Sequence, residues 1–109
     1  MKRHTTRDGW WEFVPTLRNR TPFKTSGALQ GEPTYGELWT YSRGELPGEY
    51  WDKFITSGAT YVVYSYLTPI AWENADGSWT VPDVKYSVTT SRHQSKIAAA
   101  VEGIKGNEV

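Results

Sequence analysis

The sequence predicts a single small α+β domain, with an antiparallel β-sheet of about four to five strands and two short helices packed on one face. Three observations support this class. The 109 residues are enough for one domain with its own core. Runs of β-branched and aromatic residues between positions 60 and 89 surround an Asp76-Gly77 turn signal. Two further stretches, near 48–57 and 92–102, space their apolar residues at the helical period.

Composition narrows the class of protein. Aromatic residues make up 15% of the chain and hydrophobic residues only 38%. Because aromatic side chains bury a large area each, a small core can be built from few of them, but the same residues also make binding surfaces. The absence of cysteine excludes disulfides, thiolate catalysis and cysteine-ligated metals. Short apolar runs and a polar N-terminus without signal-peptide character predict a soluble, cytoplasmic protein.

The first half of the chain predicts few long elements. Residues 1–8 are polar and basic, and we expect a flexible arm. Trp10–Val14 is rich in β-prone residues and ends at Pro15, which lacks a ladder donor, so an edge strand is expected there. Residues 16–48 are interrupted so often by glycine and proline that only short extended pieces fit.

A short helix is predicted near residues 48–57. Pro47 suits its first turn, and Gly58 suits the left-handed position after its last turn. Its apolar residues fall on one face, which we expect to be core. They are Tyr50, Trp51, Phe54 and Ile55.

The sheet is expected to be built around Thr60–Leu67, a run that is apolar on both faces and therefore predicts a central strand. Further strands are predicted at Ile70–Glu73, Ser78–Val81 and Lys85–Thr89. The hairpin across Asp76-Gly77 is expected to bring Trp72 and Trp79 near each other.

The second helix, near residues 92–102, is predicted to start with Ser91 and Gln94 in a capping box. Gly103 is expected to stop it. The compact domain then spans residues 9–104, and residues 105–109 form a flexible tail.

Several blocks resemble a family of small uncharacterised proteins encoded by actinobacteriophages and their prophages, known as a domain of unknown function. The blocks are Tyr61–Tyr66, Thr68–Trp72, the pair Trp79 and Pro82, Tyr86–Gln94, and the upstream Phe23–Gly31. Tyr86–Gln94 is the most specific, and the resemblance covers roughly residues 23–94. It implies a phage origin and a location in the host-cell cytoplasm. It implies no activity.

The densest polar cluster, residues 89–94, is the best candidate site. A helix N-terminus with Arg92 suits an anion such as phosphate, whereas the plainer interpretation is an ordinary helix cap. We expect Arg92, His93 and Gln94 to form a contact surface with Trp72 or Trp79 nearby.

Catalytic and metal-binding signals are weak. His93 can act as a general base with Ser91 or a threonine as nucleophile, but no motif supports it, and we expect no enzyme. His4 and His93 lack the spacing and companions of metal ligands, and no cofactor-binding glycine pattern is present. Neither a metal nor a cofactor is expected.

The sequence therefore predicts a phage accessory protein that acts as a non-enzymatic binding module on a host or phage macromolecule, with a protein as the expected partner. The alternative is nucleic-acid binding through a basic, tryptophan-containing N-terminal region, where residues 1–29 carry six basic and two acidic side chains. An overall pI near 6.7 argues against that alternative. Its residues are Arg7, Trp10, Trp11, Arg18 and Arg20. No membrane is expected as a partner, and the oligomeric state stays open.

Overall fold

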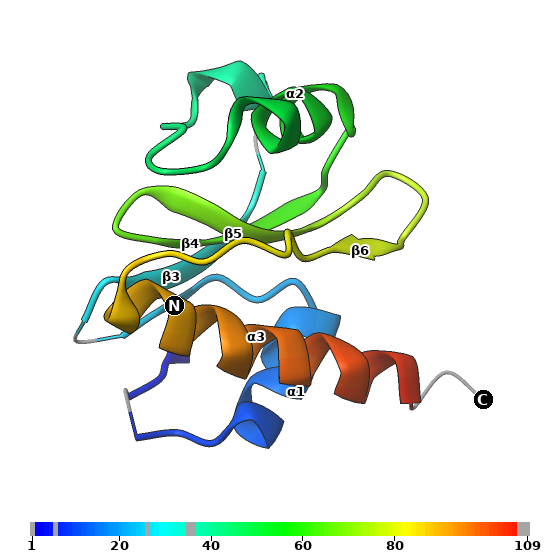
Figure 1. Ribbon diagram of the computed structural model, residues 1–109. Helices are drawn as coiled ribbons and strands as arrows, with labels where there is room; N and C mark the ends of the chain where they lie inside the picture. The colour runs from blue at the N-terminus through cyan, green and yellow to red at the C-terminus, as the bar shows by residue number, and fades with distance from the viewer. Residues whose placement is uncertain (1, 6, 26, 35–36, 107–109) are drawn as a thin grey trace.

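A mixed β-sheet lies between two layers of helix in the computed structural model (Figure 1). The structure describes residues 2–5, 7–25, 27–34 and 37–106. Within them the sheet has six strands in the order of the chain, with β1 parallel to β2 and all other neighbours antiparallel. The strands are β1 (Lys2–Arg3), β2 (Phe23–Lys24), β3 (Leu29–Pro33), β4 (Tyr61–Ser65), β5 (Thr68–Glu73) and β6 (Trp79–Thr80). The helical elements are α1 (Trp10–Arg18), the 3₁₀ turn η1 (Leu38–Thr40), α2 (Gly48–Thr56) and α3 (Val88–Gly106).

The α+β class and the single small domain agree with the prediction, but the placement of the helices does not. The two predicted helices, now α2 and α3, cover opposite faces of the sheet (Figure 1). Strand β4 explains why, because successive side chains point to opposite faces. Tyr61 and Val63 pack with α1 and α3, whereas Val62 packs with α2. A central strand that is apolar on both faces needs cover on both.

The predicted edge strand at Trp10–Val14 is wrong, since these residues begin helix α1. The helix starts at Gly9, whose N–H donates to the Glu12 carboxylate, and it continues through Pro15. Helical spacing places Phe13, Val14 and Leu17 on one face, where all three are buried against the sheet and α3. An extended strand would split them between two faces, and the lost burial decides the outcome.

The predicted strand at Lys85–Thr89 is also wrong. Residues 81–87 are irregular, and α3 begins at Val88. The Ser87 hydroxyl accepts a hydrogen bond from the Thr90 N–H, so Ser87 takes the capping role that was predicted for Ser91. The helix is one turn longer at its start than expected, and its polar cluster lies along its side.

The hairpin between β5 and β6 turns at Asp76-Gly77 as predicted, with Gly77 in the left-handed region at φ 88°. The expected closeness of the two tryptophans is wrong. Trp72 pairs with Thr80 and packs under α2, whereas Trp79 packs on the opposite face against Tyr61. Residues that oppose each other with an offset of one position point to opposite faces of a sheet.

The ends of the chain join the fold more than the sequence indicates. Lys2 and Arg3 form β1, and His4 is buried with its ring stacked 4.0 Å from that of Phe13. At the other end, residues 105 and 106 of the predicted tail belong to α3. Positions 1 and 6 of the predicted arm and 107–109 of the predicted tail lie outside the described residues.

Candidate functional site

A two-residue turn joins β4 to β5 through Tyr66 and Leu67. Both residues are left-handed, with φ of 48° and 71°. Two successive left-handed residues give the turn whose twist best matches a hairpin, but asparagine and glycine are the residues that adopt it cheaply. For other residues the conformation costs roughly 1–2 kcal/mol each. The turn also exposes 61% of Tyr66 and 62% of Leu67.

This turn is held on one side by α3. The Ser65 hydroxyl, which is fully buried, lies 2.7 Å from Nδ1 of His93 and 3.3 Å from the hydroxyl of Thr90. Burial and the charge of Lys96 lower the pKa of His93, so its imidazole is neutral at neutral pH. In the neutral tautomer that carries its proton on Nε2, Nδ1 accepts a hydrogen bond from the Ser65 hydroxyl. Ser65 therefore ties the end of β4 to the first turns of α3.

Two loops hold the turn from other directions. The Thr68 hydroxyl accepts a hydrogen bond of 2.9 Å from the Glu45 N–H, and the Tyr66 N–H donates to the Ala28 carbonyl at 3.4 Å. Gly44 packs so closely that an added Cβ would lie 2.8 Å from the Thr68 Cα, and its φ of 55° is a left-handed conformation that favours glycine. The turn is thus fixed by three neighbours while its two large side chains project into solvent.

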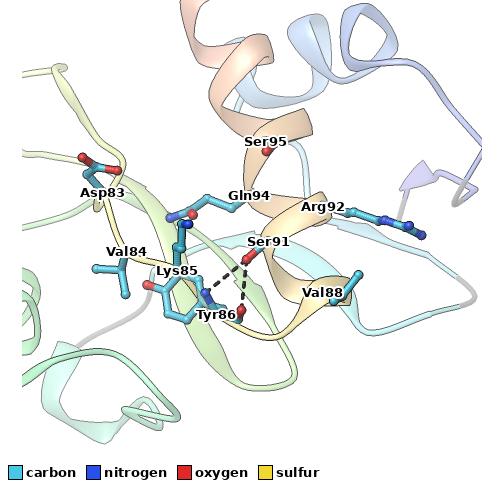
Figure 2. Close-up of a pocket in the computed structure, with 9 residues that line it drawn as sticks. All are labelled: Asp83, Val84, Lys85, Tyr86, Val88, Ser91, Arg92, Gln94 and Ser95. Atoms are coloured by element: carbon cyan, nitrogen blue, oxygen red, sulfur yellow. Dashed lines mark hydrogen bonds between the residues drawn. The ribbon is translucent and has the colours of Figure 1, made fainter.

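A groove of about 670 Å³ opens between α3 and the irregular segment before it (Figure 2). Two hydrogen-bonded straps form it, because Ser91 bonds to the backbone N–H and carbonyl of Tyr86, and Gln94 donates to the Pro82 carbonyl. Val88 is 70% exposed at its rim. The lining residues are Asp83, Val84, Lys85, Tyr86, Val88, Ser91, Arg92, Gln94 and Ser95.

The Tyr86 hydroxyl is buried without a hydrogen-bond partner among the described residues. Burial, with smaller effects from Tyr50 and Glu45, raises the pKa of Tyr86 to about 12. The hydroxyl therefore stays protonated at physiological pH.

The structure separates the five residues predicted for the contact surface. Arg92 is exposed, and Figure 2 shows it extending away from α3 on a different side from Gln94. Gln94 is occupied by its strap, and His93 is half-buried against Ser65. Trp72 is fully buried and Trp79 is packed into the core on α3's side of the sheet, so the exposed indole platform expected here is absent from the described residues.

The residues that sequence reasoning missed are Tyr66, Leu67 and Val88. The sequence predicts a continuous strand through Tyr66 and Leu67 because β-prone residues run without a glycine or asparagine from Thr60 onward. The sequence does carry one signal for a turn. Two β-prone runs, Tyr61–Ser65 and Thr68–Glu73, lie on either side of the Tyr66-Leu67 pair. A two-residue hairpin loop fits that spacing.

The Ser65–His93 pair has the geometry of a nucleophile and its base, but not the access. Ser65 is 0% exposed, so its hydroxyl cannot reach an acyl or phosphoryl group in solution. The pair connects β4 to α3. Within the described ranges no three histidine, aspartate or glutamate side chains gather as metal ligands would.

The N-terminal residues of the alternative function do not form one patch. Trp11 is 62% exposed and Trp10 is 40% exposed, with Trp10 also packed near Gly103 of α3. Arg7 and Arg18 are exposed near opposite ends of α1. Arg20 is engaged in a 2.5 Å ion pair with Glu73, a buried residue of β5.

His4 was expected in a flexible arm, but it makes a buried polar contact that the sequence did not reveal. Its Nδ1 lies 2.7 Å from the Asp8 carboxylate and its Nε2 lies 2.8 Å from the Thr16 hydroxyl. Hydrogen bonds from Thr5 and then His4 lower the pKa of Asp8 to about 2. These contacts dock the first residues onto α1.

The sequence pattern of a family of unknown function, DUF8033, matches residues 15–108. The chain belongs to DUF8033. The match includes the β4–β5 turn, the groove and all of α3, and it extends beyond the residues 23–94 on which the resemblance rested. It begins after His4 and after the first five residues of α1. No curated protein matches this DUF8033 chain, and no solved structure does either.

Across the described part of this DUF8033 protein, no helix combines the length and apolar character that crossing a bilayer requires.

Proposed function

We propose that this DUF8033 protein is a phage accessory protein and a non-enzymatic binding module, which engages a host or phage protein through the β4–β5 turn. The observation that carries the proposal is the Tyr66–Leu67 pair, which is both strained and exposed. Backbone strain persists where the surrounding structure imposes it, and it is concentrated at functional sites. Phage origin and a host-cytoplasm location are supported by the resemblance of residues 61–66 and 86–94.

The energetics of the turn favour a contact outside the chain. The hairpin needs two left-handed residues but not two large side chains, and most of the surface of Tyr66 and Leu67 is in solvent. Their burial under a partner would return about 25 cal/mol for each Å² of apolar surface. Tyrosine is also enriched among the residues that dominate protein interfaces.

The rigidity of the turn lowers the cost of association. Side chains that must be ordered on binding cost roughly 0.5–1.5 kcal/mol each. Hydrogen bonds at Ser65, Tyr66 and Thr68 already fix the backbone that carries the pair. The exposed Val88 side chain lies in the first turn of α3, the element to which Ser65 is bonded, and it lines the groove.

The test is capture of a partner from an actinobacterial lysate with wild type and a Tyr66→Asn/Leu67→Gly variant. The variant has the residues that the turn prefers, so the fold is kept while both apolar side chains are removed. We expect partners that are enriched on wild type to be lost from the variant. A Trp39→Ser variant, which removes an equally exposed aromatic side chain from η1, should retain them. Identical partner lists for all three proteins would refute the proposal.

A second candidate, nucleic-acid binding through the N-terminal region, is favoured by the 62% exposure of Trp11 and by the exposed basic side chain of Arg7 shortly before α1. Stacking of bases on exposed aromatic residues, together with lysine and arginine contacts to phosphates, is how single strands are bound without sequence preference. It predicts binding to single-stranded DNA that falls steeply with salt and is lost in Trp11→Ala. In a gel-shift assay, DNA binding that does not change with salt, or that is unchanged in Trp11→Ala, would exclude this second candidate.

A further inference from the structure

A second hollow lies along α3, and it shares Arg92 with the groove. Its volume is about 370 Å³, and the described residues that line it are Thr89, Arg92, His93 and Lys96. Arg92 and His93 lie three and four positions after Thr89, and Lys96 lies four and three positions after them, so the four residues form one stripe on the helix. The hollow is made by side chains in the first three turns of α3, which starts at Val88.

The side chains of this stripe share one chemical character. Arg92 offers a planar fork of N–H donors, Thr89 a hydroxyl and Lys96 a further positive charge. Arg92 is exposed and so is free to turn toward a ligand. Lys96 already interacts within the molecule, with its Nζ 5.9 Å above the Phe13 ring, and contributes its charge from that position.

His93 completes the stripe because Ser65 decides which of its nitrogens is available. The Ser65 hydroxyl lies 2.7 Å from Nδ1 and fixes the orientation of the ring; in the tautomer whose Nδ1 accepts that hydrogen bond, Nε2 carries the proton. A neutral imidazole in that state is an N–H donor. The hollow therefore combines donors of three kinds, all of which suit an oxygen-rich anion.

We infer that the hollow formed by Thr89, Arg92, His93 and Lys96 is a binding site for a phosphate group. Its volume exceeds the share of several water molecules, at about 30 Å³ each in the liquid, so a phosphoryl group and part of the molecule that bears it fit inside. Arg92 provides the bidentate contact, and Thr89 and His93 provide single donors. The inference does not depend on docking at the β4–β5 turn, because it concerns a different set of side chains.

The experiment is a titration of the ¹⁵N-labelled full chain with inorganic phosphate at pH 7.5, followed by NMR. We expect saturable shifts of the His93 ring, the Arg92 side chain and the Thr89 amide, and none with sodium chloride at equal ionic strength. Arg92→Ala should weaken the apparent affinity about tenfold, the usual effect of losing one charge-assisted contact. Arg18→Ala, which removes an exposed arginine from the end of α1, should bind like wild type.

Phenyl phosphate in a parallel titration distinguishes the source of the group. Tighter binding of the monoester assigns the site to a phosphate carried on a larger molecule, and equal binding assigns it to the free ion; both support a phosphate site. Shifts that chloride reproduces, or equal affinity in Arg92→Ala, would overturn the inference. Because no partner protein is present, the result is independent of whether the Tyr66–Leu67 turn captures one.

Discussion

Replacing Tyr66 and Leu67 by asparagine and glycine should make the protein more stable, although it removes two large side chains. Each left-handed residue other than glycine or asparagine costs roughly 1–2 kcal/mol. The new glycine offsets about 0.5–1 kcal/mol of this gain, because it gives the unfolded chain more conformational freedom to lose on folding. Little contact is lost, since 61% of Tyr66 and 62% of Leu67 are already exposed. We expect a net gain in the free energy of unfolding of about 1 kcal/mol.

Urea denaturation followed by tryptophan fluorescence measures this gain. For a domain of this size the midpoint should rise by roughly 0.5 to 1 M at an unchanged slope. In thermal unfolding the same gain should raise Tm by roughly 4–8 °C.

A matched control separates strain from exposure. Leu67→Gln removes an exposed apolar side chain but keeps the left-handed strain, so the free energy of unfolding should stay within about 0.5 kcal/mol of wild type. If the Asn-Gly variant is no more stable than wild type, the strain argument fails. If Leu67→Gln is equally stabilising, exposure and not backbone strain is the cause.

Three further predictions concern the neighbours of the turn and the N-terminus. Gly44→Ala should lower the free energy of unfolding by about 2 kcal/mol or more, and by more than Gly77→Ala, because both are left-handed but only Gly44 meets a neighbouring backbone; equal losses in urea denaturation would refute the close approach. His93 has a lowered pKa in the folded protein, so its contribution to stability is present above its unfolded pKa of about 6.5 and is lost as the pH falls below it. In His93→Gln the free energy of unfolding should fall less between pH 7.5 and 5.5 than in wild type. The same fall in both proteins would contradict this prediction. His4→Ala should cost about 2 kcal/mol or more in urea denaturation, since a buried side chain with two polar partners is lost, and no measurable change would show that residues 1–8 are the flexible arm that the sequence predicts.

For the candidate site, the sequence identified the polar residues but not the directions of their side chains. Arg92, His93 and Gln94 were found because polar residues cluster before an apolar stripe, and α3 does carry them. Their directions were not predictable, since a helix that starts at Val88 moves these residues from the helix end to its second turn, where each one faces a different neighbour. Ser87 and not Ser91 caps the helix, so Gln94 holds the segment at Pro82 and His93 meets Ser65.

The sequence by itself determined the features whose energy is local. The bounds of α2 follow from Pro47 and Gly58, and the β5–β6 turn follows from Asp76-Gly77, because cap and turn preferences act within a few residues. The sequence also indicates that both faces of β4 are covered, because that strand is apolar on both sides.

Only the tertiary structure decided the features whose energy comes from distant residues. Trp10–Val14 has β-prone residues, yet it is helical because Phe13 and its neighbours gain more by packing against α3. Tyr66 and Leu67 accept a left-handed turn because hydrogen bonds to the chain around residues 28, 45 and 93 hold it. Local preferences of about 1 kcal/mol give way wherever burial and long-range hydrogen bonds supply several times as much.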